Sequence, residues 1–384
     1  MKILHVVPTY LPAVRYGGTI RSVHGLCVAL TALGHEVHVF TTNVDGDGNS
    51  KVALCQSVDV EGVQVWYFPS RTLRRLYWSP KMKKALLQAV PGFDLVHLHS
   101  VFLWPTWAAA RVANQSGVPY VVSPRGMLVK DLVRRKSKLL KLAWTKLIER
   151  HTLVSASAIH VTAEKELDGL RRFDFDLPVV WTVPNGLNGP DVSALKNADD
   201  FPGTTQFALF LGRINWKKGL DRLIEAWKDV PNATLLIAGN DEESYQSNLE
   251  RLATKFGVAE RIRFVGMVQG ESKWRLFRDA ELFILPSYSE NFGMSVLEAM
   301  FMGCPVVVTP EVGLAEAIAE SKAGLVVAGD PTSLSREIGK LLGDADRRQE
   351  MGANGRRLAS TRYSWRRVAG QMVDKYETIV ADHV

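Results

Sequence analysis

Cysteine is scarce in this sequence of 384 residues. Cys27, Cys55 and Cys304 are widely spaced, and no two of them form a Cys-x-x-Cys pair. An odd, scattered set of this kind indicates neither a disulfide framework nor a zinc site. We therefore expect reduced thiols, as in the cytosol.

Long apolar runs and targeting signals are also missing. No apolar run approaches the roughly 18 residues that a membrane-spanning helix needs. The first ten residues, MKILHVVPTY, lack the pattern of a signal peptide. These absences predict a cytoplasmic protein.

The dinucleotide-binding fingerprint Gly-x-Gly-x-x-Gly is absent as well, which argues against a nicotinamide-dependent dehydrogenase. What is present is the composition of an ordinary globular enzyme. Hydrophobic residues make up 46% and charged residues 23%, which excludes a disordered chain. The length suits two domains of about 150 to 200 residues each.

Positive charge is concentrated in the first half of the chain. Residues 1–190 contain 23 Lys and Arg against 13 Asp and Glu, a net charge of +10, whereas the remainder contains 24 against 27, a net charge of −3. Such a basic half suits nucleic acid, anionic lipid or phosphorylated substrates. It contains no recognised nucleic-acid-binding module, so we expect no nucleic-acid partner.

Two basic runs account for much of this charge. Residues 71–88 carry six basic and no acidic residues, and residues 130–150 carry eight basic residues against two acids. The second run predicts either an amphipathic helix lying on an anionic membrane surface or a solvated helix packed by one face. Both interpretations stay open.

Strands and helices alternate along both halves, which predicts an α/β fold with parallel sheets covered on both faces. The first βαβ unit is a strand over residues 2–10, a loop with Gly17 and Gly18, a helix over Thr19–Leu33 and a strand over residues 35–42. A polar stretch at 191–205 reads as the linker. The later strands are predicted within residues 63–68, 93–100, 118–123, 204–212, 233–239, 261–268, 281–287, 305–310 and 323–328, and the stretches 156–170 and 177–187 continue the alternation of strands and helices.

The stretch from Ser287 to Val307 has the strongest functional signal. Glu290 lies in a polar turn, and Glu298 follows eight residues later on an apolar-patterned helix. Ser295 is the predicted N-cap, and the first backbone N–H groups of such a helix form an anion site. Carboxylates that bind sugar hydroxyls would then flank amides that bind phosphate. A first-turn Glu beside an exposed loop Glu is the simpler alternative.

Other candidate residues follow predicted strands. Arg213 and Lys218 lie five residues apart in one loop, and His97 and His99 lie on one face of another strand. The carboxyl ends of parallel strands are where ligands bind, which favours His99 as a site residue. No carboxylate or third histidine accompanies the pair in the sequence, so we expect no metal.

Six motifs in order resemble those of a known family, the retaining nucleotide-sugar glycosyltransferases, which include sucrose-phosphate synthases and many bacterial polysaccharide and lipid glycosyltransferases. The resemblance covers nearly the whole chain. Its motifs are Gly17-Gly18 before the helix that ends in LGHEV, His99 at a strand end, VPNG at Val183–Gly186, GRINWKKG at Gly212–Gly219, the Glu290 to Glu298 spacing and the closing YSW helix.

The resemblance implies the GT-B architecture, two Rossmann-like domains that face each other across a cleft. Residues 1–190 would bind the acceptor, residues 205–363 would bind the nucleotide sugar, and the helix over 364–384 would cross back to the first domain. It also implies transfer with retention of configuration, by same-face attack, and no cofactor or metal.

The resemblance further assigns roles to single residues. Arg213 and Lys218 would hold the pyrophosphate, Glu298 the ribose and Glu290 the transferred sugar, while His99 would stand beside the reacting carbon. The catalytic set is therefore His99, Glu290, Arg213 and Lys218, and the donor-binding set is Gly17, Gly18, Asn185, Arg213, Lys218, Glu290, Phe292, Gly293, Met294 and Glu298.

Arg125 departs from the family pattern, which often has a histidine at that strand end. An arginine there predicts contact with a phosphate or carboxylate of the acceptor. The expected reaction moves a sugar from a UDP- or GDP-sugar to a bacterial glycan acceptor, including a lipid-linked one at the inner face of the cell membrane. The alternative is a cytosolic transferase that makes a free disaccharide or small glycoside.

Overall fold

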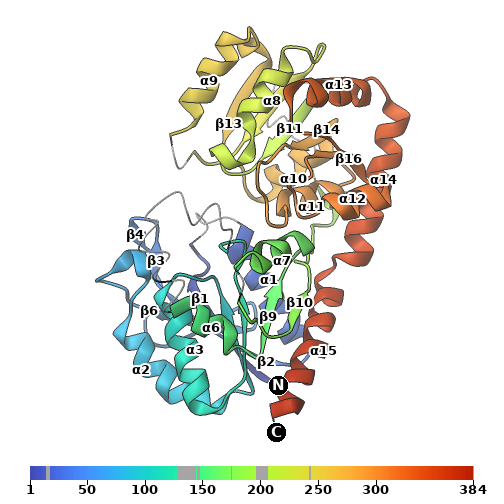
Figure 1. The fold of residues 1–384 in the computed structure, drawn as a ribbon. Helices are drawn as coiled ribbons and strands as arrows, with labels where there is room; N and C mark the ends of the chain where they lie inside the picture. The colour runs from blue at the N-terminus through green and yellow to red at the C-terminus, as the bar shows by residue number, and fades with distance from the viewer. Residues whose placement is uncertain are drawn as a thin grey trace. The chain divides into compact units, whose positions relative to one another are not determined.

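The computed structural model describes residues 1–13, 18–128, 144, 148–173, 175–195, 206–241 and 244–383. The chain forms two compact units (Figure 1). The first unit contains Met1–Gly186 together with Trp365–Val384, and the second contains Leu187–Ser364. The predicted α/β fold class, with two Rossmann-like units, is confirmed.

The first unit is built on an eight-stranded sheet with the order β10-β9-β8-β7-β1-β2-β6-β5. All neighbouring strands are parallel except β5 and β6. The strands are β1 Lys2–Thr9, β2 Glu36–Thr42, β5 Ser57–Val60, β6 Val63–Phe68, β7 Leu95–His99, β8 Tyr120–Ser123, β9 Ala158–Val161 and β10 Val180–Thr182, and β3 Val44–Asp45 pairs with β4 Gly48–Asn49 in a separate hairpin.

Strand β5 was not predicted, because residues 43–62 have no strand-length apolar run. It joins β6 antiparallel through a two-residue turn at Glu61 and Gly62, with φ of 56° and 84°. Positive φ at both positions belongs to the type I′ turn, whose twist matches that of a β-hairpin. Turn geometry, rather than hydrophobic patterning, therefore adds this edge strand.

Helices cover both faces of this sheet, as the alternation of side chains along its strands requires. Leu4 and Val6 of β1 belong to a core shared with α2 and α3, whereas Ile3 and Val7 belong to a core shared with α1 and α15. The helices of this unit are α1 Gly18–Ala32, α2 Pro80–Ala89, α3 Trp104–Ser116, α6 Arg150–Val154, α7 Glu164–Arg171 and α15 Trp365–His383, with short 3-10 helices η1 Arg74–Leu76 and η2 Val90–Gly92.

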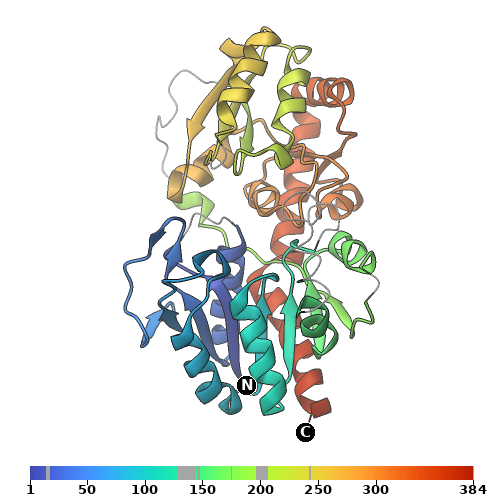
Figure 2. The same ribbon diagram turned by 60° about the vertical axis from the view of Figure 1, so that its left-hand side comes forward.

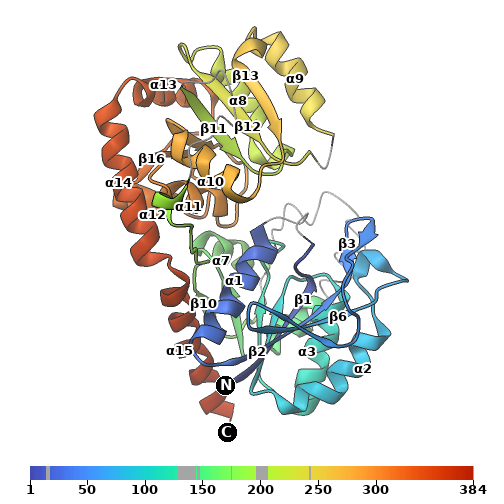
Figure 3. The ribbon, with the colours of Figure 1, turned by 180° about the vertical axis from the view of Figure 1, so that it is seen from behind.

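The last helix, α15, packs on the first unit, as predicted, and lies along α1 (Figure 3). Its first residue, Trp365, fits where two glycines leave room. A Cβ atom would lie 2.4 Å from the Trp365 ring at Gly25 and 2.5 Å from it at Gly186. The indole is 8% exposed, so the segment that returns from the second unit is anchored by a buried aromatic side chain.

The second unit has a fully parallel six-stranded sheet with the order β13-β12-β11-β14-β15-β16. Figure 2 shows this unit in yellow-green to orange. All six strands predicted for this half are present. They are β11 Phe207–Leu211, β12 Thr234–Ala238, β13 Ile262–Gly266, β14 Leu282–Leu285, β15 Val306–Val308 and β16 Gly324–Val326. The helices are α8 Leu220–Trp227, α9 Gln246–Lys255, α10 Gly270–Asp279, α11 Met294–Phe301, α12 Ala315–Ser321, α13 Pro331–Leu342 and α14 Ala345–Arg362, with 3-10 helices η4 Val192–Ala194, η5 Trp216–Lys218 and η6 Ala259–Arg261.

Among the residues that the structure describes, no helix is long and apolar enough to cross a membrane.

Histidines form a buried polar row inside the first sheet. His5, His97, His99 and His160 lie on β1, β7 and β9, and each is at most 3% exposed. Burial, helped by the positive charge of Arg125, lowers the pKa of His5 and of His160 to about 3. Burial also lowers the pKa of His97 and of His99 well below 6.5. All four rings are therefore neutral near pH 7.

This row should make the protein lose stability in mild acid. As the pH falls below 6.5, each histidine takes up a proton in the unfolded chain, whereas the folded rings stay neutral down to about pH 3 for His5 and His160. We expect this contribution to the free energy of unfolding to be complete above pH 6.5. At lower pH the free energy of unfolding should decrease by about 1.4 kcal/mol per pH unit for each such histidine. Urea denaturation between pH 7 and 5 measures this slope.

Matched variants distinguish the effect of the buried histidines on this slope from the effect of other titrating groups. His160→Asn should give a shallower slope, while His151→Asn, at an exposed position, should keep the parental slope. Equal slopes for the parent and His160→Asn would contradict the prediction.

Candidate active site

The loop after β11 carries the two predicted phosphate-binding cations. Asn215 caps η5 by accepting a hydrogen bond from the Lys217 N–H at 3.1 Å, and Gly219 ends it with φ of 66°. A Cβ atom at Gly219 would lie 1.9 Å from the Pro286 carbonyl oxygen. Only glycine permits this close approach. The loop after β11 is therefore held against the loop after β14.

This contact brings Lys218 to Glu290. The Tyr288 N–H donates to the Lys217 carbonyl at 2.7 Å, and the Lys218 ammonium donates to a Glu290 carboxylate oxygen. Both side chains are partly exposed, at 15% for Lys218 and 19% for Glu290. The two residues are 72 positions apart in the sequence. Arg213 is exposed in the same loop as Lys218.

The backbone of Glu290 is fixed from its other side. Its N–H donates to the Glu311 carbonyl at 3.1 Å, and its carbonyl accepts from the Gly313 N–H at 3.0 Å. A Cβ atom at Gly313 would lie 2.0 Å from the Asn291 carbonyl oxygen, so the two loops are in close contact. Glu290 thus lies in a rigid turn.

Helix α11 begins after this turn at Met294, and Gly293 is its N-cap with φ of 101°. The predicted N-cap, Ser295, is wrong: it lies in the first helical turn. A residue in that turn has helical dihedral angles, whereas the turn before it needs the positive φ that glycine adopts most easily. Gly293 has no side chain that could cap the helix, and the N–H groups of a first helical turn have no partner within the helix.

Glu298 lies in the second turn of α11 and forms an ion pair with Lys273 of α10. The Lys273 ammonium donates to its carboxylate at 2.8 Å, and the two side chains are 13% and 11% exposed. Sequence reasoning missed Lys273. Its only sequence signal is a lysine on the apolar side of an otherwise amphipathic helix.

Arg222 was also missed, although it shapes this site. Its guanidinium donates to the Pro286 carbonyl at 2.8 and 2.6 Å and lies 4.1 Å from the centre of the Tyr288 ring. The Tyr288 hydroxyl donates to Asp221 at 2.9 Å. These contacts fix the segment that leads to Glu290.

A second group of predicted residues meets in the first unit. Arg125 follows β8 with a left-handed φ of 56°, and Gly126 has φ of 71°. The Arg125 guanidinium donates to Asn185 Oδ1 at 2.9 Å and to His99 Nδ1 at 3.2 Å. The Glu166 carboxylate accepts from the Gly126 N–H at 2.5 Å, which holds this turn in place.

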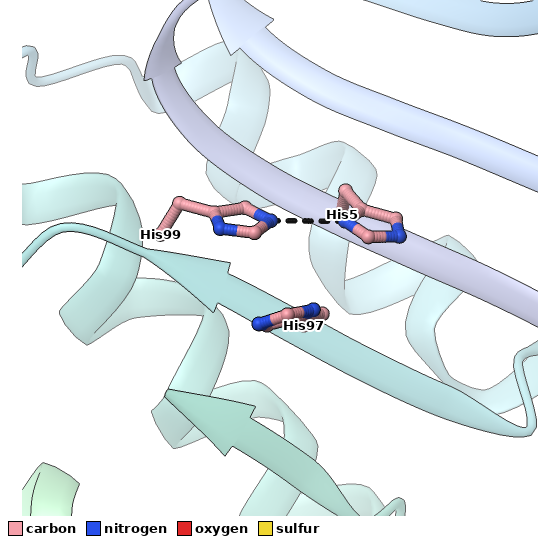
Figure 4. Close-up of side chains that lie close together, drawn as sticks. All are labelled: His5, His97 and His99. Carbon is pink, nitrogen blue, oxygen red and sulfur yellow. Dashed lines mark hydrogen bonds between the residues drawn. The ribbon is translucent and has the colours of Figure 1, made fainter. Parts of the chain in front are cut away.

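The hydrogen bonds around His99 define which nitrogen carries the proton. A guanidinium can only donate, so Nδ1 of neutral His99 accepts from Arg125. Its Nε2 therefore carries the proton and donates to His5 Nδ1 at 2.9 Å (Figure 4). His99 is 0% exposed, and both its ring nitrogens are used within the unit.

A second chain of hydrogen bonds starts at the Val183 carbonyl, which accepts from His160 Nε2 at 2.8 Å. His160 Nδ1 then accepts from the Ser123 hydroxyl at 2.6 Å, and Ser123 Oγ accepts from His97 Nε2 at 2.7 Å. His97 Nδ1 is left to accept from the Tyr376 hydroxyl at 2.6 Å. Burial raises the pKa of Tyr376 well above its usual value, so this hydroxyl keeps its proton.

The structure places a third histidine, His5, beside His97 and His99, and the sequence did not indicate this. Nitrogen atoms of the three rings lie within 4.8 Å of one another, a spacing that could hold a metal ion. The Nδ1 lone pairs of the three rings already accept from His99, Tyr376 and Arg125, and Arg125 adds a positive charge. The donor set therefore fits a hydrogen-bonded row and not a cation site.

Some predictions lie outside the described residues. Gly17 is one of them, although Gly18, the first residue of α1, is described. Most of the basic run 130–150 is another, so its contact with an anionic membrane stays a prediction.

Two family models match the chain, one in each half. The model described as "Glycosyl transferase 4-like domain" matches residues 17–186, and the model described as "Glycosyl transferases group 1" matches residues 191–358.

Relatives with similar sequences span the whole chain. An uncharacterized glycosyltransferase of Methanocaldococcus jannaschii is 27% identical over 98% of both chains. The phosphatidyl-myo-inositol mannosyltransferase of Mycobacterium leprae is 28% identical over 94% of this chain and 93% of its own. The D-inositol 3-phosphate glycosyltransferase of Salinispora tropica is 26% identical over 99% of this chain and 85% of its own.

Solved structures share the fold. Sucrose-phosphate synthase from Thermosynechococcus elongatus superposes with a TM-score of 0.80, at 22% identity over 99% of both chains. The Anabaena protein HepE, solved with UDP and glucose, gives a TM-score of 0.74 at 18% identity, over 98% of this chain and 100% of its own. The two family models, which together match residues 17–186 and 191–358, show that the chain is a glycosyltransferase, and these structures show that it has the GT-B fold.

Proposed function

We propose that the chain moves a sugar from a UDP- or GDP-sugar to a hydroxyl of a bacterial glycan acceptor, with retention of configuration and without a metal. The observation that carries the proposal is the contact between Lys218 and Glu290. A nucleotide sugar has a negative diphosphate beside neutral hydroxyl groups. Its diphosphate would take Lys218 from Glu290, and the freed carboxylate would accept hydrogen bonds from the sugar.

The residues around this pair suit the rest of the donor. Arg213 is in the same loop as Lys218, and the uncapped start of α11 offers backbone N–H groups to phosphate. Glu298 would accept hydrogen bonds from the ribose. HepE was solved with UDP-glucose, which makes UDP the first base to test.

In the proposed step, the bond between the anomeric carbon and the diphosphate oxygen breaks, and the electron pair stays on the diphosphate. The acceptor oxygen forms its bond to the same face of the anomeric carbon, and its proton passes to the departing phosphate oxygen. Negative charge grows on the diphosphate, so fixed cations at Arg213 and Lys218 stabilise the transition state more than the ground state. Glu290 orients the sugar and forms no covalent bond.

Arg125 is the proposed contact for an anionic group of the acceptor. His99, buried beneath it, would act on the substrate through Arg125. A small phosphorylated acceptor is the second candidate, because the Salinispora relative is named for D-inositol 3-phosphate. A panel of glycan acceptors and small acceptors separates these two candidates. Transfer to a small acceptor would give a free disaccharide or small glycoside as the product.

Glu290→Ala should lower the rate of sugar transfer about 100-fold or more, because the sugar loses its orienting carboxylate. Binding of the free nucleotide, measured by calorimetry, should stay within a few-fold of the parent. The control is Glu316→Ala, an exposed carboxylate in the first turn of α12. Unchanged turnover in Glu290→Ala would remove Glu290 from the site.

Lys218→Gln should lower kcat by about 100-fold or more, because the departing diphosphate loses a fixed cation. Lys217→Gln is a close control, since it removes a neighbouring positive charge that lies over the Trp216 ring, 6.0 Å from its centre. Steady-state release of UDP measures both. Equal losses in the two variants would indicate a general charge effect and contradict the assignment.

Arg125→Ala should raise the KM for an anionic acceptor about 10-fold, the loss expected for a charge-assisted hydrogen bond. The KM for the donor should stay near the parental value. The matched control is Arg111→Ala, on α3. Intact acceptor affinity in Arg125→Ala would refute this role.

A further inference from the structure

A pocket of about 440 Å³ opens in the first unit, away from the residues discussed above. It lies where β2 and β6 end, since Asn43 follows β2 directly and Pro69, Ser70 and Arg71 follow β6. These two strands are parallel neighbours, with Thr42 opposite Phe68. The pocket therefore occupies the carboxyl edge of a parallel sheet, which is where such sheets bind ligands.

The charged side chains that line the pocket are both arginines, Arg71 and Arg74. Arg71 is exposed and forms no ion pair with any residue that the structure describes. The sequence has no Asp or Glu between Glu61 and Asp94. The charged groups that line the pocket thus suit an anion.

Ser70 adds a hydrogen-bonding group. It is 2% exposed, and its hydroxyl oxygen has no hydrogen-bond partner among the described residues. A buried hydroxyl without a partner destabilises a folded protein. The Ser70 N–H donates to Asn43 Oδ1 at 3.3 Å, which fixes the position of the residue. An oxyanion in the pocket could accept from the Ser70 hydroxyl.

The short helix η1, which carries Arg74, is flanked by residues in a strained conformation. Leu73 and Tyr77, on either side of η1, have left-handed φ of 47° and 58°. Non-glycine residues adopt this conformation at a cost, and such strain tends to occur at binding sites. Arg74 donates to Asn49 Oδ1 at 2.5 Å and to the carbonyls of Gly46 and Gly48, so it ties η1 to the β3–β4 hairpin.

The pocket lies on the same sheet edge as Arg125. In the sheet order, β7 and β1 separate β8, which Arg125 follows, from β2, and β6 follows β2. With about 4.8 Å between neighbouring strands, the ends of β2 and β6 lie roughly 14 to 19 Å from the end of β8. An anion in the pocket would therefore lie well beyond a group that contacts Arg125.

We propose that this pocket binds a phosphate or carboxylate of the acceptor, at a point remote from the hydroxyl that receives the sugar. The term acceptor rests on the proposed function, whereas the pocket, its arginines and its unpartnered hydroxyl do not. The acceptor is then an extended molecule with its own negative charge. The basic run at residues 71–88, which the donor site does not use, supplies the two arginines.

Calorimetric titration at low salt tests the proposal with three probes: glucose 6-phosphate, glucuronic acid and glucose. We expect the parent protein to bind one or both anions and to bind glucose at least 10-fold more weakly. Tighter binding of glucose 6-phosphate would identify a phosphate as the source of the charge, and tighter binding of glucuronic acid would identify a carboxylate.

Two neighbouring arginines provide the variants. Arg71→Gln should weaken binding of the preferred anion about 10-fold, and Ser70→Ala should weaken it by a smaller factor. Arg75→Gln removes the same charge from an exposed position that does not line the pocket, so it should bind as the parent does. Equal effects of Arg71→Gln and Arg75→Gln, or equal binding of glucose and the anions, would overturn the proposal.

The same proteins should be titrated with UDP and GDP. None of the residues proposed to bind the donor lines the pocket, so Arg71→Gln should bind the nucleotide with parental affinity. Nucleotide binding without anion binding would overturn the pocket alone. Anion binding without nucleotide binding would overturn the proposed donor site and leave the pocket standing.

Discussion

The close approach of two loops in the second unit determines the geometry of its site. Gly219 lies so near the Pro286 carbonyl that a Cβ atom would be 1.9 Å from it. Arg222 donates two hydrogen bonds to the same carbonyl. Because the loops are fixed together, Lys218 reaches Glu290 across 72 positions of sequence. A cation and a carboxylate thus lie side by side, and this is the arrangement that we propose to bind a nucleotide sugar.

In the first unit, the guanidinium of Arg125 is held at the end of a buried sheet. A row of neutral histidines does this, because His97, His99 and His160 each donate from one ring nitrogen and accept at the other, and His5 accepts at Nδ1. Arg125 donates to His99 at one end of the row. Tyr376 of α15 donates to His97, which belongs to the second chain of hydrogen bonds. The C-terminal helix is therefore bonded to the same polar interior that supports Arg125.

Local patterns predicted most of the fold. The six strands of the second unit and the parallel strands of the first are apolar runs of the right length, and the glycines at 219 and 293 mark turns that need positive φ. Strand β5 was missed because its pairing depends on a turn, and Ser295 was misjudged because the cap position depends on backbone angles. Lys273, Arg222 and His5 were missed because their partners are 25, 64 and 94 residues away.

The sequence by itself determined the α/β class, the two units, the motifs that resemble glycosyltransferases and the basic character of the first half. These depend on periodicity, spacing and composition, which are local or additive. Only the tertiary structure decided which nitrogen of His99 carries its proton, that Glu298 pairs with Lys273 and that Ser70 is buried beside two arginines. Contacts of this kind join strands and loops that are distant in the chain, so they exist only once the sheet order is fixed.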